Sequence, residues 1–266
     1  MKHLSKYIAA LLLLWAAVPA QAQEELFGSS AAEKRHSGFI LNGNVSADIP
    51  LMDMAKRFGA DYRVGASLTY KTNKNWIFGV KYDFLLGNNT KEDSLAYNIR
   101  DKYSGSFNGK VFQVLNVNGE RIGVPVYERG FLWGLQIGKI IPLKKGQKDN
   151  GLMLLTSGGM MQHRINIFAR DGDVAQIQGD YMKGYDRLTQ GFFVEQFVGY
   201  VYFSKNRFVN FNIGLDLAWG FTKGKRAYLF DVGHADLDKR NDVLFGLRGA
   251  WMIPIFRPKS EDISFE

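Results

Sequence analysis

The chain alternates apolar and polar residues over long segments, and this pattern constrains its fold more than any other feature. Within residues 207–222, for example, Phe211 and Ile213 alternate with Asn212 and Gly214. A period of two places successive side chains on opposite faces of a strand, which a helix cannot do. The pattern predicts eight strands, over residues 38–49, 60–72, 76–87, 129–143, 151–168, 189–203, 207–222 and 242–256.

The lengths of these segments and of their connections indicate a membrane barrel. Strands in soluble proteins average about 5–6 residues, whereas a tilted membrane-crossing strand needs about 9–11. A barrel that starts in the periplasm alternates long outer loops with short inner turns. Every second connection is short here: 73–75, 144–150 and 204–206. We therefore expect an all-β, antiparallel, up-and-down transmembrane barrel of eight strands in the outer membrane, with both termini in the periplasm.

Aromatic residues support the same fold. Trp76, Trp133, Trp219 and Trp251 all lie on the apolar parity and near strand ends, as in the interfacial girdles of membrane barrels. A soluble lipocalin-type barrel is the alternative, and it would place the bulky apolar parity inside. The opposite parity is rich in glycine, which suits a narrow lumen, so we favour the membrane barrel.

The strand count has one open alternative. Residues 110–117 and 120–127 flank Asn118-Gly119, a strong hairpin-turn signal. The two arms are either an outer extension of the neighbouring strands or two further barrel strands, which would make ten. Each arm is short and Pro125 disturbs the second. We favour the extension.

The beginning of the chain resembles a secretory signal peptide. A basic start precedes an apolar run, and Ala20-Gln21-Ala22 provides a small-x-small cleavage site. After residue 22 the sequence contains no run of about 18 apolar residues, so no membrane-spanning helix is predicted there. The expected organisation is a signal peptide at 1–22, a periplasmic segment at 23–37, the barrel at 38–256 and a periplasmic tail at 257–266.

Charge and composition limit the possible ligands. The formal net charge of +8 is modest and forms no stripe, so we expect no nucleic-acid partner. Cysteine is absent and the four histidines are scattered, so no metal cluster and no cofactor are expected. Outer-membrane lipid and lipopolysaccharide are the expected surroundings. Basic residues flanking one outer loop either are solvated or bind lipopolysaccharide phosphates: Lys223, Lys225, Arg226, Lys239 and Arg240.

The polar parity predicts charges inside the barrel. An eight-stranded lumen is just wide enough for its own side chains, so a general diffusion pore is not expected. Buried charges must be paired, which favours a salt-bridged plug over a path for protons or solutes. Strand offsets predict that Asp216 meets Arg248 and that Arg164 meets Glu195. The full predicted interior network is Arg63, Lys81, Asp83, Arg164, Glu195, Asp216 and Arg248.

Two pairs of residues in the outer loops are candidates for catalysis. Asp171 with Asp173, and His234 with Asp236, have the residue types that activate water in omptin-type barrel proteases. Asp is common in polar loops, so we interpret both pairs as ordinary loop residues and expect no enzyme.

One run of sequence is more particular than the barrel pattern. Residues 179–188 read Gly-Asp-Tyr-Met-Lys-Gly-Tyr-Asp-Arg-Leu. Together with the signal peptide, the alternating strands and the short turns, this run resembles small outer-membrane barrels of the Bacteroidota, in the OmpA-like, OmpW-like and PorT-like group. The resemblance covers nearly all of residues 36–256. It implies the fold and no established activity.

The long connection 88–128 suggests a role in docking. Its apolar side chains exceed what a bare extracellular loop needs, which is typical of a surface that binds a protein partner. We expect a non-enzymatic barrel that is a structural or docking component of an envelope complex for secretion, gliding or assembly. The alternatives are a narrow porin-like channel or transporter, and third a surface protease or lipid-acting enzyme. The predicted partner loop contains Val111, Phe112, Val114, Ile122, Val124 and Val126.

Overall fold

The computed structural model describes residues 37–101, 103, 107–144, 148–169, 174–204 and 209–256. The predicted signal peptide, nearly all of the segment 23–37 and the tail 257–266 lie outside these residues, as do Asp171 and Asp173. No helix among the described residues has the length and apolarity needed to span a membrane.

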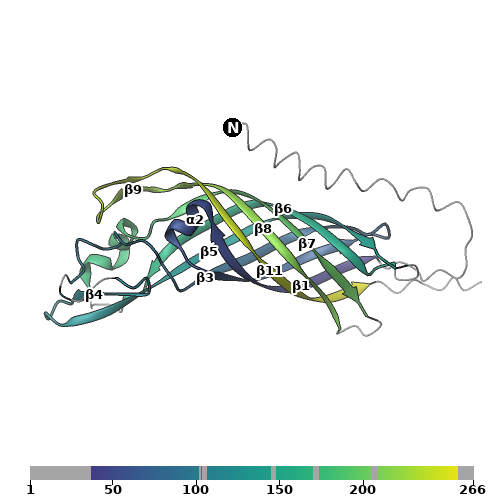
Figure 1. Ribbon diagram of the computed structural model, residues 1–266, viewed down its shortest axis with the longest axis horizontal. Helices are drawn as coiled ribbons and strands as arrows, with labels where there is room; N and C mark the ends of the chain where they lie inside the picture. Colours follow the sequence, from purple (N-terminus) through teal and green to yellow (C-terminus); the bar gives the residue numbers. More distant parts are fainter. Residues whose placement is uncertain are drawn as a thin grey trace, which may run out of the picture. The chain divides into compact units, whose positions relative to one another are not determined.

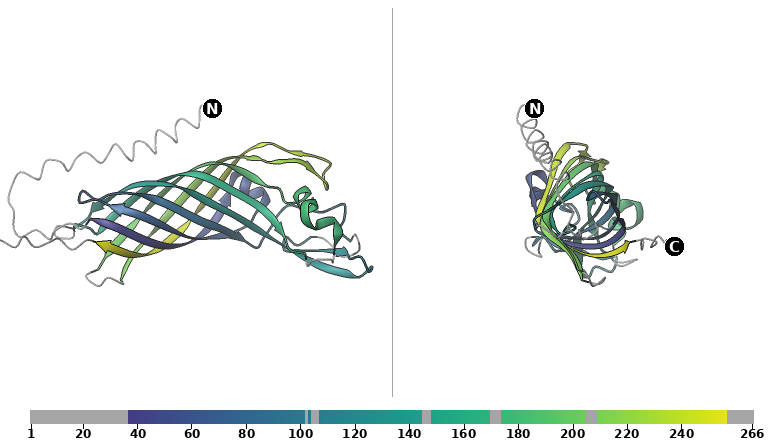
Figure 2. Two further views of the ribbon diagram at one scale, coloured as in Figure 1. Left: turned by 180° about the vertical axis from the view of Figure 1, so that it is seen from behind. Right: turned by 90° about the vertical axis from the view of Figure 1, so that its right-hand side faces the viewer.

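Eight antiparallel strands form a closed barrel (Figures 1 and 2). Each strand pairs with the next one in the chain, and β1 pairs with β11 to close the ring. The prediction of eight strands in an up-and-down order is therefore confirmed. The strands are β1 (Gly38–Leu51), β2 (Asp61–Lys71), β3 (Trp76–Gly87), β5 (Arg121–Pro142), β6 (Gly151–Ile167), β7 (Thr189–Phe203), β8 (Asn210–Gly224) and β11 (Lys239–Phe256).

The hairpin at Asn118-Gly119 extends the barrel wall and adds no barrel strand. Strand β4 (Val111–Leu115) pairs with the outer part of β5, from Pro125 to Arg121, and its one other pairing among the described residues is an isolated bridge from Val114 to Arg100. Gly119 has a φ of 80°, a left-handed conformation that glycine adopts without strain. Strand β5 therefore runs without a break from the barrel into the hairpin, and the ten-strand alternative is wrong.

The long connections fold into short elements at one end of the barrel, on the left of Figure 1. We call these elements, with the described residues that join them, the outer cap. The cap consists of α2 (Met52–Arg57), β4, the 3-10 helices η3 (Ala175–Ile177) and η4 (Gly179–Gly184), and the two-stranded sheet of β9 (Arg226–Leu229) and β10 (His234–Asp236).

The barrel is apolar outside and polar inside, the reverse of a soluble barrel. In β1, Phe39 and Val45 are exposed, whereas Asn44 and Asp48 are buried. The other barrel strands except β6 carry exposed apolar residues on their outward parity, among them Tyr62, Val80, Phe84, Leu135, Phe192, Leu215, Leu247 and Trp251. Only a lipid environment makes such a surface favourable, because in water it would be a very large exposed apolar patch.

Strand β6 contradicts the predicted parity. Met161 and Ile165 are fully buried and face the interior, whereas Arg164 is exposed and faces outward. The prediction treated the more apolar parity as the lipid face. It failed because apolar clusters fill both ends of the lumen, and β6 supplies side chains to each of them.

The lumen is filled in three layers. At the end with the short turns, eight buried apolar residues from six strands pack together: Ile40, Ile77, Ile140, Met153, Leu155, Phe197, Val201 and Met252. At the outer end, Leu85, Leu132 and Phe193 pack under Met54 and Phe58 of the cap. Buried polar and charged side chains occupy the layer between these clusters.

Candidate functional site: the sealed lumen and its outer cap

Arg63 is the centre of the ion pairs in the lumen. Its Nε and Nη2 each donate to one oxygen of Asp48 at 2.8 Å, a bidentate pair. Its Nη1 donates to Glu195 at 2.7 Å and its Nη2 to Asp216 at 2.8 Å. All four side chains are buried, and they come from β2, β1, β7 and β8. One guanidinium group therefore links strands around much of the ring.

Lys81 continues this network toward β3. Its Nζ contacts Glu195, and it also lies 2.7 Å from Asp83. Asn44 donates to the other oxygen of Asp83 at 2.9 Å. We call Asp48, Arg63, Lys81, Asp83, Glu195 and Asp216 the lumen network. Its charges are paired across a barrel too narrow for a water-filled channel.

The structure forms neither of the two pairs predicted from the strand offsets, Asp216 with Arg248 and Arg164 with Glu195. Asp216 lies opposite Gly246, and Arg248 lies two residues further along, opposite Gly214. The prediction took Thr222 and Asp242 as opposite residues at the outer ends of the two strands. In the structure Thr222 lies opposite Arg240, and pairing continues outward to Lys223 and Lys239, so the observed register differs from the predicted one by two residues.

Arg248 and Arg164 occupy other places. Arg248 is buried with its guanidinium group 5.2 Å from the ring centroid of Phe197. Glu195 lies opposite Ser157 of β6, and Arg164 faces outward, 4.0 Å from Asp186 in the cap. Arg164 is therefore not part of the interior, and the prediction that it meets Glu195 is wrong.

Two carboxylates outside the lumen network have no counter-charge in contact in the part of the chain that the structure describes. Asp61 and Glu128 are each almost completely buried, and none of their four carboxylate oxygens has a hydrogen-bond partner among the described residues. They flank Gly87, the residue between them across β3. A side-chain carbon at Gly87 would lie 2.6 Å from Glu128 Oε2, so only glycine leaves room for this carboxylate.

A third carboxylate near the outer end is satisfied through one of its two oxygens. Asp242 accepts a hydrogen bond from Thr222 at 2.5 Å, and its Oδ2 lies 2.8 Å from Nε2 of His163, across the lumen. The ring of Phe58, the residue after α2, packs edge-on against His163, with centroids 5.5 Å apart. The sequence prediction missed Asp61, Glu128 and Asp242. Asp61 and Asp242 lie on the inward parity of their predicted strands, and Glu128 lies on it one residue before the predicted start of its strand, so the alternation was the signal that would have found them.

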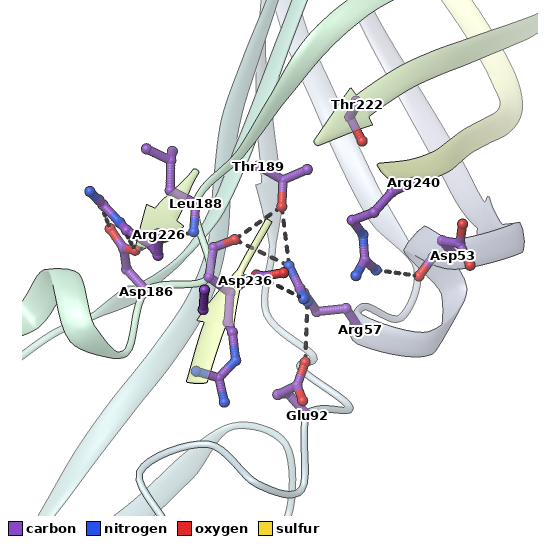
Figure 3. Close-up of polar contacts among 12 residues, drawn as sticks. Asp53, Arg57, Glu92, Asp186, Leu188, Thr189, Thr222, Arg226, Asp236 and Arg240 are labelled. Atoms are coloured by element: carbon purple, nitrogen blue, oxygen red, sulfur yellow. Dashed lines mark hydrogen bonds and ion pairs between the residues drawn. The ribbon is translucent and has the colours of Figure 1, made fainter. Parts of the chain in front are cut away.

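Arg57 of α2 joins the outer connections to one another (Figure 3). Its side chain donates to Glu92 at 3.1 Å, to Thr189 Oγ1 at 3.1 Å and to Asp236 at 3.4 Å. It also donates to the backbone carbonyl of Arg187 at 3.1 Å. These partners come from the other three long connections or their ends, so one buried side chain fixes all four.

Helix α2 is also held to β11. Asp53 accepts a hydrogen bond from the backbone N–H of Asn241 at 2.9 Å, and Arg240 donates to the backbone carbonyl of Asp53 at 2.9 Å. The backbone N–H of Asn241, together with Lys56, holds the pKa of the Asp53 carboxyl below its usual range. Asp53 therefore stays ionised, and α2 closes the outer end of the lumen.

Two residues of the run 179–188 form ion pairs that connect parts of the cap. Arg187 makes a bidentate pair with Asp231 at 2.8 and 2.9 Å, and Asp231 also accepts from the backbone N–H of Ala96 at 2.8 Å. Asp186 binds Arg226 through both oxygens, at 2.7 and 2.5 Å. Arg187 has a φ of 51°, a strained conformation for a residue with a side chain. This sequence run thus has a structural role in joining three connections.

The predicted partner loop is largely internal. Phe112, Val114, Val124 and Val126 are buried in the cluster that continues from the lumen into the cap, and Ile122 packs against it. The expectation that these side chains form an exposed surface is wrong for them, because they provide the core of the cap. Val111 is exposed, and it shares the opposite face of β4 with Leu115.

The described candidates for chemistry are not assembled into a catalytic site. His234 is exposed and its Nδ1 lies 2.9 Å from the backbone oxygen of Ala235, whereas Asp236 is buried against Arg57. Within the described ranges, no three His, Cys, Asp or Glu side chains are placed to hold a metal ion.

Comparison with known proteins gives likenesses of fold only. No protein-family model and no curated protein sequence matches the chain. Neisserial surface protein A matches 82% of this chain and 98% of its own, with a TM-score of 0.41 and 10% identity. Ail, the attachment invasion locus protein of Yersinia pestis, matches 82% of this chain and 99% of its own, with a TM-score of 0.39 and 11% identity. The outer membrane protein OprG from Pseudomonas aeruginosa matches 83% of this chain and 97% of its own, with a TM-score of 0.33 and 12% identity.

Proposed function

We propose that this protein is a non-enzymatic outer-membrane barrel that holds a folded platform outside the cell and docks a protein partner there. Apolar outward faces and aromatic residues near the strand ends support the membrane location, with the short turns and both termini in the periplasm. The run 179–188 supports the grouping with Bacteroidota barrels. The lumen network supports an anchor that does not conduct.

The hairpin of β4 and β5 carries the docking proposal. One face of its first arm is anchored, because Phe112 and Val114 are buried in the cap. The other face displays Val111, Leu115 and Val117, which are 41%, 50% and 70% exposed. Apolar side chains held in fixed positions by a packed cap cost little entropy to bind, which is how docking surfaces gain affinity.

A charge introduced on this face should abolish docking without unfolding the cap. We expect Leu115→Glu with Val117→Glu to reduce recovery of a cross-linked partner at least about tenfold, because burying two carboxylates in an apolar interface is costly. Lys110→Glu, an exposed change at the base of the same hairpin, is the control and should recover the partner as the wild type does.

The readout is quantitative mass spectrometry after cross-linking in cells and gentle detergent purification. Heat-modifiable mobility and resistance of the cap to protease should be unchanged in both variants. Full recovery of the partner with the double variant would contradict the proposed docking face.

A further inference from the structure

Five basic side chains face outward near the outer rim of the barrel. Arg129 of β5 and Arg164 of β6 lie on the outward parity, since Glu128 and His163 beside them are buried inside. Lys223 of β8, Lys239 of β11 and Lys225, just after β8, are exposed. We call these five residues the basic row.

The basic row lies directly outside a group of aromatic side chains. Toward the outer end, Arg129 lies two residues from Phe131 and four from Trp133 on β5, and Lys223 lies two residues from Phe221 on β8. Two residues of a strand advance about 7 Å. The aromatic rings mark the edge of the apolar band, so the charges lie where lipid headgroups begin.

The row places like charges directly opposite each other. Arg129 lies directly opposite Arg164 in the pairing of β5 with β6, and Lys223 lies directly opposite Lys239 in the pairing of β8 with β11. Like charges at directly opposite positions destabilise a sheet. The described residues offer no ion pair to Lys223, Lys225 or Lys239. An anion bound between the strands would remove this repulsion.

The two arginines of the row are only partly satisfied. Arg129 donates to the backbone carbonyls of Gly87 and Glu128, at 3.2 and 2.6 Å, which leaves its charge unneutralised. Arg164 lies 4.0 Å from Asp186, but both oxygens of Asp186 are already bound by Arg226.

The structure changes the basic set predicted from the sequence. Arg226 is paired with Asp186, and Arg240 is half-buried between the backbone of Asp53 and the carboxylate of Asp242. Neither is available to a lipid. Arg129 of β5 and Arg164 of β6 take their place, and β7 separates these two strands from β8.

We infer that the basic row binds the phosphate groups of lipopolysaccharide in the outer leaflet. The inference rests on the proposed outer-membrane location. Guanidinium groups bind phosphate oxygens in a bidentate manner and lysines add point charges. The arginine pair on β5 and β6 and the lysine pair on β8 and β11, with β7 between them, provide one place for each phosphate of a ligand with two phosphates. Binding would hold the lipid against the aromatic face beneath.

The test uses the purified full barrel in detergent micelles and bisphosphorylated lipid A as the probe, with dephosphorylated lipid A for comparison. Fluorescence of Trp133 and Trp219, which lie under the row, reports binding. We expect Arg129→Gln, Arg164→Gln, Lys223→Gln and Lys239→Gln together to weaken binding of the bisphosphorylated lipid at least about tenfold, since each basic residue near a charged lipid surface contributes. Added salt should weaken wild-type binding.

The control variant combines Lys74→Gln with Lys144→Gln, exposed lysines at the other end of the barrel, and should bind as the wild type does. Equal binding of bisphosphorylated lipid by the quadruple variant would overturn the inference, and so would full competition by inorganic phosphate, which would make the ligand a free anion. Heat-modifiable mobility shows that the variants are folded. Fractionation of cell membranes tests the outer-membrane location separately.

Discussion

Replacement of Arg63 by methionine should destabilise the barrel by about 3–5 kcal/mol, because it leaves Asp48, Glu195 and Asp216 buried without the guanidinium group that neutralises them. Methionine keeps much of the volume, so the loss reports charge more than packing. Unfolding by urea in lipid vesicles, followed by tryptophan fluorescence, measures the free energy of unfolding.

The control for Arg63→Met is Lys56→Met. Lys56 lies 2.8 Å from Asp53 but its side chain is 77% exposed, so its loss should cost less than about 1 kcal/mol. Adding Asp48→Asn and Asp216→Asn to Arg63→Met should restore part of the lost stability, because fewer uncompensated charges remain. If Arg63→Met is as stable as Lys56→Met, the lumen network does not hold the barrel together.

Replacement of Asp61 by asparagine and Glu128 by glutamine should have the opposite effect. These carboxylates are buried with no hydrogen-bond partner among the described residues, so holding negative charge there opposes folding. We expect the double variant to gain about 1–4 kcal/mol, by analogy with buried ion pairs that are replaced by uncharged side chains of similar volume.

This gain should increase as the pH is raised, because more negative charge must then be kept in the wild-type lumen. Asp93→Asn, a change of the same type in a cap connection, should leave stability within about 0.5 kcal/mol at every pH. Urea unfolding in vesicles at several pH values measures the difference. A double variant that is less stable than the wild type would show that the two carboxylates have a counter-charge in the native protein.

The barrel itself could be predicted from the sequence because its outer surface has one requirement. Every lipid-facing position must be apolar, so β1, β2, β3, β8 and β11 alternate clearly. Strand β6 does not, because its inward residues must also fill the apolar layers at both ends of the lumen. Periodicity alone cannot distinguish two apolar faces, and Arg164 was placed inside for that reason.

The strand register and the contacts of the cap could not be predicted from the sequence. The pairing of β8 with β11 continues past Thr222 to Lys223, and a shift of two residues leaves the alternation unchanged. The role of Arg57 in connecting the parts of the cap could not be predicted. Its hydrogen-bond partners Glu92, Thr189 and Asp236 lie 35, 132 and 179 residues away in the sequence. The hydrophobic residues of 110–127 were recognised as exceptional, but their burial depends on elements far along the chain.

Conductance of the purified protein in planar lipid bilayers tests the central claim most directly, namely that the lumen is sealed by paired charges between two apolar layers. Protein that is shown to be folded by heat-modifiable mobility should leave the bilayer conductance unchanged at applied potentials of either sign, because an eight-stranded barrel filled with its own side chains has no continuous water path. Steady, ion-selective current steps from folded protein would contradict the account, and the narrow channel would then replace the sealed anchor as the function of the barrel.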